Sequence, residues 1–567
     1  MKKTIHSVLF SALFSLIFIS CSNKINHIDS YSETINDTLT IKVLDYKTPS
    51  PDQENGGVYD TIAHFPKKGE WRKILMVQTI KCDASTKRDK YPCGEWDYIT
   101  NTMIHVNEGN ATNKFQINSF VTPYGKRLNL TDKGWEYVWD VTDYAPILKG
   151  DRRIEHGNNQ ELHDLKFLFI KGKPSRNVLK VENIWTYGKY KYEDLALDSV
   201  LKEKKVAILK EGKNFKLKSR ISGHGHSGPY NCCEWDEKIH SYRIKGNEFP
   251  INWTVWKDCG HNPIHPQGGT WQFDRAGWCP GTAVDTHDFE ITPFAIGKDS
   301  ISLDYQIEMF DDNGEKDGFF RMSHQLITYD APNFNTDAAI IEIKSPNNKL
   351  RYRRSIIAND GTPIIKVRNE GKSLIKKITF TYGVKGGEEY TNTWYGELKF
   401  LEEKEIILPP VKMDNLNDTQ TFYVAIKKVN NDRDDQTLNN FATSEWNLPK
   451  VFPKEMIIKI QTNDIGRASE NSYTLINEDG KLIKERAVFP ENTIIADTLR
   501  LEKGLYTWII RDTKEDGMIR HWWYRKEKPD EVGRNGKIEF MNIQDTEVLA
   551  APPFDFADFY SFSFRIK

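Results

Sequence analysis

The chain has 567 residues, enough for three or four domains of ordinary size that each bury a separate core. Its 79 Lys and Arg residues nearly cancel its 80 Asp and Glu residues, which argues against a nucleic-acid-binding protein, because such proteins usually carry a basic face. Aromatic residues make up 12% of the chain. Most are expected to fill β-type cores, and the rest suit carbohydrate binding, because Trp and Tyr faces stack on sugar rings.

The first 21 residues are predicted to be a targeting segment and not part of the fold. Lys2 and Lys3 form a basic start, residues 8–19 form an apolar run, and a small residue precedes Cys21. The apolar run is too short for a comfortable membrane span. The pattern resembles a bacterial lipoprotein signal, in which Cys21 carries the lipid. It predicts an exported protein attached to the outer membrane, on the periplasmic face or the cell surface, with simple secretion as the alternative.

The remaining six cysteines support export, because an even count in an exported chain indicates disulfide bonds. They are Cys82, Cys93, Cys232, Cys233, Cys259 and Cys279. A bridge between the adjacent Cys232 and Cys233 would be strained, because their Cα atoms lie about 3.8 Å apart across a trans peptide, below the usual disulfide range. Two free thiols, or pairing with a distant cysteine, are the alternatives.

Short strands dominate the secondary-structure signal along the chain. Runs rich in β-branched and aromatic residues lie near turn-forming residues at 73–80, 165–170 and 301–307. No long, well-capped amphipathic helix stands out. The sequence therefore predicts an all-β protein built from sandwiches or jelly rolls.

After about Asn335 the Trp- and Cys-bearing loops give way to a plainer pattern. Residues 336–452 are predicted to form an immunoglobulin-like β-sandwich, and residues 453–567 a second one, with Pro449 and Pro453 marking a linker. In the last module the loop with Asp512, Asp516 and Gly517 has oxygen ligands that suit Ca²⁺, although a plain Asp-Gly turn is the favoured interpretation.

Three segments in the first 335 residues each combine a cysteine, a tryptophan and a carboxylate. They are residues 91–98, 222–236 and 270–281. Glu-Trp-Asp occurs in the first segment and again in the second. A carboxylate beside a large apolar surface has a raised pKa, which suits acid/base chemistry near neutral pH. For any one segment alone, simple packing of stapled loops on Trp is the better explanation, but the three together indicate an active site.

At these segments the chain resembles the peptide-N-glycosidase F family, over about residues 39–335. The resemblance rests on five runs: Val121-Thr-Pro-Tyr124, Asp140-Val-Thr-Asp143, Ser222-Gly-His-Gly-His226, Cys259 with Asn262-Pro-Ile264, and Asp274-Arg-Ala-Gly-Trp-Cys-Pro-Gly281. It implies two adjacent antiparallel jelly rolls that form the catalytic unit, at residues 39–190 and 191–335, after a linker at 22–38. The two further sandwiches have no counterpart in the minimal family member.

The resemblance implies an amidase that releases N-glycans from proteins or peptides and converts Asn to Asp, with no cofactor or metal. The implied catalytic residues are Asp97 as general base and Glu234 as the second carboxylate, with Arg275 holding Asp97 or the substrate. The expected substrate-binding residues are Arg275, Trp96, Tyr98, Trp235, Trp278 and His226, with the tryptophans walling the cleft. The implied disulfides are Cys82–Cys93 and Cys259–Cys279. A monomer is expected, with membrane contact only through the lipid and no nucleic-acid partner.

Three positions depart from the family pattern. Tyr98 stands where the family has Arg, Ile170 aligns without gaps with the family's third functional carboxylate, and Asp236 replaces a disulfide cysteine. Losing the Arg and the carboxylate would remove two charge-assisted contacts, each contributing about 1.5–3 kcal/mol, to the inner chitobiose core. We therefore expect altered glycan specificity more than lost chemistry.

Two other functions fit parts of the sequence. A copper- or zinc-dependent enzyme would use His224 and His226, supplemented by His240, His261, His265 or the adjacent cysteines. A non-catalytic glycan-binding lipoprotein on the same scaffold would explain Tyr98 and Ile170. Glycan binding without release of an Asp-containing peptide would identify the latter.

Overall fold

The computed structural model describes residues 37–48, 57–85, 90–109, 111–157, 160–227, 232–309, 318–352, 361–412 and 419–567. The predicted signal peptide with Cys21, and residues 22–36 of the predicted linker, lie outside these residues. Within them the structure is nearly all β, as predicted, and almost every strand pair is antiparallel. No helix in the described ranges has the length and apolar character needed to cross a bilayer.

The first jelly roll packs two four-stranded sheets face to face. One sheet has the order β1 (Thr38–Leu44), β8 (Leu162–Lys171), β3 (Trp71–Lys81), β6 (Trp135–Asp140). The other has the order β2 (Val58–Phe65), β7 (Gly150–Gly157), β4 (Ile99–Glu108), β5 (Ala111–Val121), and the short helix η3 (Thr142–Tyr144) follows β6. In β8 buried and partly exposed residues alternate, so that Leu165, Phe167 and Phe169 face the core.

The second jelly roll repeats this plan. One sheet has the order β10 (Lys204–Ala207), β17 (Ser300–Ile307), β14 (Lys238–Ile244), β15 (Ile251–Val255). The other has β16 (Thr286–Glu290), β11 (Asn214–His224), β18 (Phe319–Pro332), β9 (Arg176–Lys191). The small pair β12 (His226–Ser227) and β13 (Cys232–Cys233) and the short helices α2 (Tyr192–Ala196) and α3 (Thr292–Ala295) complete it.

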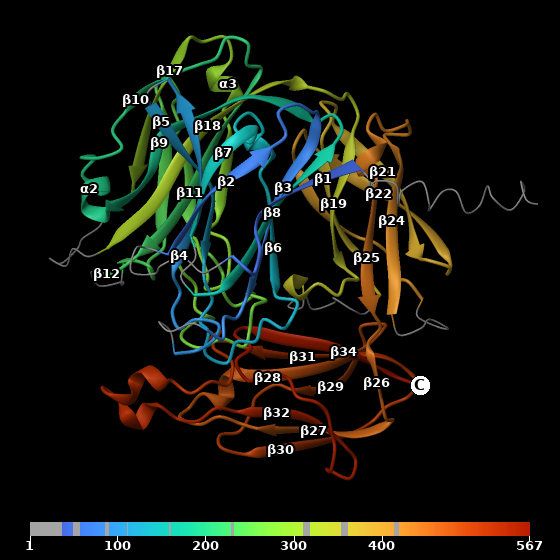
Figure 1. The fold of residues 1–567 in the computed structure, drawn as a ribbon. Coiled ribbons are helices and arrows are strands. Elements are labelled where there is room, and N and C mark those ends of the chain that lie inside the picture. The colour runs from blue at the N-terminus through green and yellow to red at the C-terminus, as the bar shows by residue number, and fades with distance from the viewer. Residues whose placement is uncertain are drawn as a thin grey trace, which may run out of the picture.

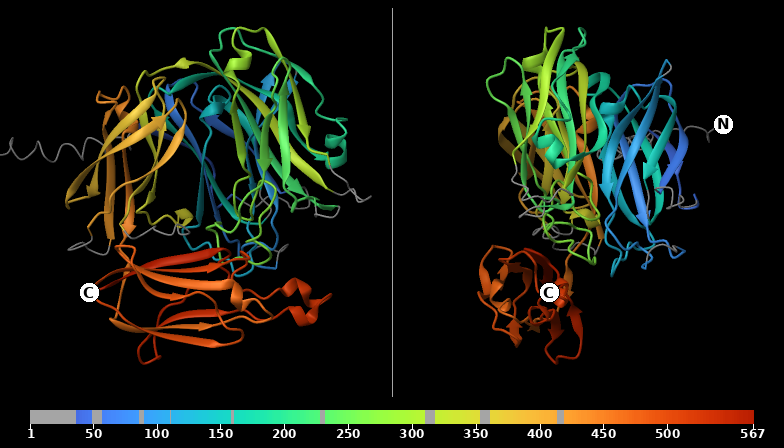
Figure 2. Two further views of the ribbon diagram at one scale, coloured as in Figure 1. Left: turned by 180° about the vertical axis from the view of Figure 1, so that it is seen from behind. Right: turned by 90° about the vertical axis from the view of Figure 1, so that its left-hand side faces the viewer.

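The long strand β9 belongs to the cores of both jelly rolls. Val178 and Val181, in its first half, pack in the first core, and Ile184 and Trp185, in its second half, pack in the second. Its partner β18 does the same, because its residues are also divided between the two cores. The two jelly rolls stand side by side (Figure 2) and share these two strands.

The third sandwich lies against the first jelly roll (Figure 1). Its sheets are β19 (Ala338–Ser345), β20 (Ile364–Asn369), β23 (Glu403–Ile407), and β22 (Glu389–Leu398), β21 (Ile375–Val384), β24 (Thr419–Val429), β25 (Phe441–Asn447), with η4 (Leu350–Tyr352) and η5 (Thr437–Asn439). They enclose their own apolar core around Trp446. The immunoglobulin-like identity of this unit stays a prediction.

The C-terminal sandwich lies beneath both jelly rolls in the view of Figure 1. One sheet has the order β26 (Lys450–Phe452), β34 (Phe559–Ile566), β31 (Gly504–Asp512), β28 (Asn471–Asn477), β29 (Leu482–Arg486). The other has β30 (Ile494–Arg500), β27 (Glu455–Gln461), β32 (Lys537–Asn542), β33 (Val548–Ala550), and the short helices are η6 (Ala468–Glu470), η7 (Trp522–Arg525) and η8 (Pro529–Glu531).

The segment between Pro449 and Pro453 is not an unpaired linker. Its three residues form β26, which pairs in parallel with β34. The chain therefore enters the C-terminal sandwich as an edge strand, which ties that sandwich directly to the end of the third one.

Candidate active site

The three Cys- and Trp-bearing segments meet at one end of the two jelly rolls. Asp97 lies in the loop between β3 and β4, Glu234 directly follows β13, and Arg275 lies in the long loop between β15 and β16. These loops are at the lower end of the jelly rolls in Figure 1, next to the C-terminal sandwich. The structure therefore brings together residues that are far apart in the sequence.

Asp97 is oriented by a tyrosine from the neighbouring strand end. The Tyr124 hydroxyl donates a 2.8 Å hydrogen bond to Asp97 Oδ2. Desolvation raises the pKa of Asp97, and the Arg275 charge and the Tyr124 hydrogen bond offset only part of the rise. Desolvation and the Asp97 charge likewise raise the pKa of Tyr124, which keeps its hydroxyl protonated as a donor.

Glu234 is held by a fully buried arginine. Arg275 Nε donates to Glu234 Oε1 at 3.1 Å, and the arginine side chain has 0% exposure. Its remaining N–H groups donate to the carbonyl oxygens of Phe273 and Thr270 and to the Thr270 hydroxyl, at 2.6–3.0 Å. Arg275 is therefore a fixed cation. The sequence analysis expected Arg275 to hold either Asp97 or the substrate. In the structure the carboxylate that accepts a hydrogen bond from Arg275 is that of Glu234.

The two carboxylates belong to one site. Desolvation raises the pKa of Glu234, the Arg275 charge lowers it, and the charge of Asp97 raises it further. His226 is exposed and its Nε2 lies 3.7 Å from Glu234 Oε2, and its charge also acts on Asp97. One buried cation therefore serves two desolvated carboxylates whose pKa values are raised, an arrangement that suits acid/base chemistry.

The tryptophans divide into exposed and buried ones. Trp96, next to Asp97, has 55% exposure and presents a free apolar face. The Trp235 ring lies 4.2 Å from the Arg275 guanidinium and stacks on His226. Trp278 has only 2% exposure and donates through Nε1 to a backbone carbonyl. It therefore packs beneath the site and does not wall an open cleft, which corrects the expectation for this residue.

The backbone around Asp97 is held from two sides. The Trp96 carbonyl oxygen accepts hydrogen bonds from Gln160 Nε2 at 2.8 Å and from the Thr122 hydroxyl at 3.1 Å. The same Thr122 hydroxyl accepts from the Tyr98 backbone N–H at 2.8 Å. Tyr98 is thus placed directly beside the site by its backbone. Gln160 and Thr122 were missed from the sequence, because nothing in their spacing marks them as partners of this loop.

Ile170, the residue that aligns without gaps with the family's third functional carboxylate, lies away from the candidate site. Ile170 lies near the end of β8, ten residues beyond Gln160, which at about 3.3 Å per residue is about 30 Å away along the strand. The carboxylate near the site on this segment is Glu161, whose Oε1 accepts a hydrogen bond from Gln160 Nε2. The altered glycan specificity expected from Ile170 stays a prediction.

Tyr124 is a site residue that the sequence analysis named only as the last residue of a run resembling the family. Its position depends on Gly125, because a Cβ there would lie 1.8 Å from the carbonyl oxygen of Gly94. Its backbone N–H donates to Gln267 Oε1 at 2.9 Å. The close packing of the segment at 121–125 on the Cys93–Gly94 turn was the signal that could have identified Tyr124.

Three disulfides cross-link the site loops. Cys82–Cys93 and Cys259–Cys279 pair as the resemblance implied. Cys232 pairs with its neighbour Cys233 across a cis peptide bond, so the alternatives of free thiols or a distant partner do not hold. Asp236, which stands where the family has a cysteine, instead forms a 2.7 Å ion pair with Lys238.

The histidines named for a metal enzyme are dispersed. His224 is partly buried and stacks between Trp278 and Phe319, and desolvation lowers its pKa to about 3. His240 is in the second core, bonded to Tyr305, whereas His261 faces the C-terminal sandwich. His265 stacks on Trp271.

Among the described residues, the group of three with metal-ligating geometry is Glu470, Asp512 and Asp516, whose ligand atoms lie within 4.8 Å of one another. The loop predicted as a candidate Ca²⁺ site or a plain turn thus gains Glu470 as a neighbour. Asp516 also forms a 2.7 Å contact with His521.

Comparisons with known proteins find similarity to peptide-N-glycosidase F proteins. Residues 191–327 match the family model described as peptide-N-glycosidase F, C terminal. The peptide-N(4)-(N-acetyl-beta-D-glucosaminyl)asparagine amidase F of Elizabethkingia miricola is 26% identical over 269 residues, which cover 45% of this chain and 75% of that protein. The structure of recombinant PNGase F is 25% identical, covers 52% of this chain and 96% of its own, and has a TM-score of 0.45. The structure of PNGF-II in one space group is 17% identical, covers 52% and 66%, and has a TM-score of 0.38.

Proposed function

We propose that this chain, which belongs to the peptide-N-glycosidase F family, hydrolyses the amide bond joining N-acetylglucosamine to an asparagine side chain. The products are the released glycan and a peptide in which Asn has become Asp. The observation that carries the proposal is the pairing of Asp97 and Glu234 in one desolvated site around the buried Arg275.

Asp97 acts as the general base. It takes a proton from water as the water oxygen bonds to the amide carbon, a role worth about 10²–10⁴-fold in rate. The carbon–nitrogen bond then breaks, and the departing glycosylamine receives a proton. Tyr124 supports this role, because its hydroxyl fixes one oxygen of Asp97 and leaves the other for water.

Glu234 orients the substrate or assists proton transfer to the glycosylamine. Desolvation raises its pKa, which suits a group that exchanges a proton, and Arg275 keeps one of its oxygens in place. Trp96 offers an exposed face on which a sugar ring can stack, and Trp235, Tyr98 and His226 complete the rim.

The test is hydrolysis of an N-glycopeptide in ¹⁸O-labelled water, followed by mass spectrometry of the peptide. The wild-type protein is expected to release the whole glycan and to place labelled oxygen in the new Asp carboxylate. Asp97→Asn should abolish the reaction, whereas Asp132→Asn, an exposed aspartate of the same jelly roll, should not change it. Glycan binding with no labelled product from the wild-type protein would show a binding module and contradict the proposal.

We also propose that the protein is exported and lipid-anchored through Cys21, with N-glycosylated proteins or peptides as its partners. Three disulfides in the site loops suit an oxidising compartment. Fractionation of cells that produce the wild-type protein or a Cys21→Ser variant provides the test. The variant is expected to leave the membrane fraction, and unchanged membrane attachment would contradict the anchor.

A further inference from the structure

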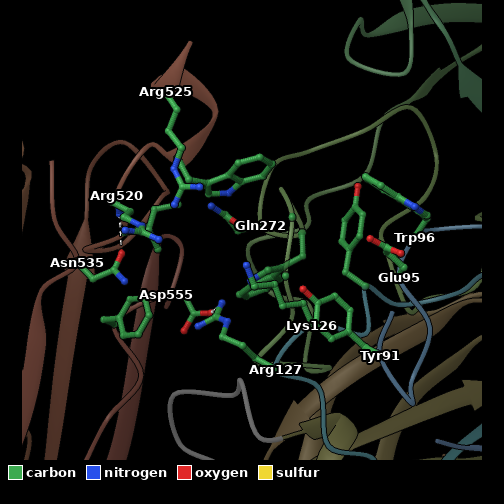
Figure 3. Close-up of a pocket in the computed structure, with 17 residues that line it drawn as sticks. Tyr91, Glu95, Trp96, Lys126, Arg127, Gln272, Arg520, Arg525, Asn535 and Asp555 are labelled. Carbon is green, nitrogen blue, oxygen red and sulfur yellow. Dashed lines mark hydrogen bonds and ion pairs between the residues drawn. The ribbon is translucent and has the colours of Figure 1, made fainter. Parts of the chain in front are cut away.

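A cavity of about 320 Å³ lies between the candidate active site and the C-terminal sandwich. Trp96, Tyr124 and Gln272 line it from the jelly rolls, and Arg520, Trp522 and Arg525 line it from the sandwich. Figure 3 shows Arg520 and Arg525 on one side, with Trp96 and Glu95 across from them. Its volume is in the range of small-ligand sites, about 300–1,000 Å³.

The cavity is a built feature, because the sandwich is fastened to the jelly rolls around it. Arg127 Nη2 lies 2.8 Å from Asp555 Oδ2, and the Asp555 side chain has 3% exposure. His261 Nε2 lies 3.3 Å from Asp558 Oδ2 at a second point of contact. A third contact is made by the rings of Phe273 and Trp523, 5.6 Å apart. Polar and aromatic contacts thus fix the two walls relative to each other.

The cavity shares two lining residues with the surroundings of Asp97. Tyr124 lines it and also donates to Asp97, and Trp96 lines it and precedes Asp97 in the chain. A glycan whose innermost sugar lies at Asp97 therefore has space to extend over Trp96 towards the C-terminal sandwich.

The charges in the cavity favour an anion. Lys126, Arg520 and Arg525 line it and form no ion pair within the part of the chain that the structure describes. The charge of Asp555 is offset by its partner Arg127, which leaves Glu95 as the remaining acidic residue of the lining. The cavity is therefore cationic in a chain whose net charge is −1.

The aromatic faces favour a sugar. Trp522 has 42% exposure and Trp96 has 55%, and both line the cavity. Exposed indole faces provide apolar surface for the C–H face of a pyranose ring, and guanidinium groups bind carboxylate or sulfate oxygens in a bidentate manner. An acidic peptide would use the arginines but has no comparable need for two flat indole faces.

We propose that this cavity is a binding subsite for an acidic sugar of the substrate glycan, one that carries a carboxylate or a sulfate ester, and that Arg520, Arg525 and Trp522 are its specificity-determining residues. The proposal deepens the proposed function and rests on it. It gives the C-terminal sandwich a direct part in substrate selection.

The first experiment compares kcat/KM for three glycopeptides with one peptide sequence and sialylated, sulfated or neutral glycans. The variants are Arg520→Ala with Arg525→Ala, Trp522→Ala, and the control Arg500→Ala, an exposed cation of the same sandwich outside the cavity. The double variant should lose about tenfold or more in preference for an acidic over the neutral glycan, because charge-assisted hydrogen bonds are removed. The control should keep the wild-type preference. Loss for the sialylated glycan alone identifies a carboxylate ligand, and loss for the sulfated glycan alone a sulfate.

Equal loss for acidic and neutral glycans would overturn the proposal. It would also be overturned if the effect of the double variant followed the number of acidic residues in the peptide and not in the glycan. Calorimetric binding of the same glycopeptides to the full-length Asp97→Asn protein separates this inference from the proposed function. A preference for the acidic glycan that disappears on adding the double substitution upholds the subsite even if no hydrolysis occurs, and no preference contradicts it.

Discussion

The jelly rolls contain two buried groups of carboxylates and cations with opposite properties. At the candidate active site Asp97 and Glu234 share one cation, and desolvation raises the pKa of both. At the contact between the two jelly rolls, Asp143 lies 2.8 Å from Lys216 Nζ and 3.1 Å from Lys218 Nζ.

In the second group the charges of the lysines lower the pKa of Asp143 by more than burial raises it. Although desolvation acts on Asp143, the two lysines and a hydrogen bond from the Tyr329 hydroxyl hold its pKa well below the usual range. Asp288 also contacts both lysines, so that the group contains two carboxylates and two cations. Burial alone therefore does not decide the protonation state of a carboxylate. The number of cations and hydrogen-bond donors around it separates a proton-exchanging site from a structural one.

The largest expected effect is at Asp97. Asp97→Asn should lower kcat for glycopeptide hydrolysis by about 10²–10⁴-fold, because the general base is lost. Its thermal unfolding temperature near neutral pH should stay the same or rise, because a desolvated charge is removed. Steady-state kinetics and calorimetry on the same preparation check both results. A kcat within a few-fold of wild type would contradict the role of Asp97.

For Asp143, unlike Asp97, we expect a large effect on stability and little effect on activity. Asp143→Ala should destabilise the jelly rolls by about 1.5–3 kcal/mol, because Lys216 and Lys218 lose one carboxylate partner and keep Asp288. The activity of the remaining folded protein should stay close to wild type, since Asp143 lies outside the candidate site. Denaturant unfolding and activity measured per folded molecule test this. Asp132→Ala, at an exposed position, provides the matched control.

The pKa values of the two groups are shifted in opposite directions, so their responses to pH should fall in different pH ranges. The pKa of Asp143 is lowered from 3.8 in the folded state, so its contribution to stability is present above about pH 4 and is lost as the pH falls through the folded pKa. The pKa of Asp97 is raised, so activity should increase as the pH rises through it and the base becomes ionised. Unfolding temperature and kcat measured from acidic to neutral pH check the two directions. An acid limb of kcat at the ordinary carboxylate pKa would contradict the desolvated site.

The smallest expected effect tests the coupling within the active site. Glu234→Gln removes a negative charge that acts on Asp97, so the pKa of Asp97 should fall and the acid limb of the residual activity should move to lower pH. A pH–rate profile of the variant, compared with that of wild type, measures the shift. An unmoved limb would mean that the two carboxylates titrate independently.

Much of the site could be predicted from the sequence because its signals are local. Asp97, Glu234 and Arg275 each lie in a short segment with a cysteine and a tryptophan, and the structure places them together. The partner of Arg275 could not be predicted, because it depends on how the two jelly rolls are joined.

Other features depend on contacts that sequence spacing does not encode. The distance of Ile170 from the site could not be predicted, because an ungapped comparison ignores where β8 begins relative to the site. Arg520 and Trp522 come from a module assigned no role, and only the docking through Arg127 and Asp555 brings them to the cavity. These features arise from contacts between distant parts of the chain, which a local sequence pattern does not reveal.

Under the proposed function, the sharing of β9 and β18 between two cores affects which sites on a glycoprotein can reach Asp97. Because both strands run from one close-packed interior into the other, these strands provide no hinge about which the jelly rolls could swing apart. The adjustment must then come from the glycoprotein. A glycosylated asparagine on a protruding turn, or in a stretch that has locally unfolded, can reach Asp97, whereas one embedded in a flat, rigid surface is shielded by its own fold.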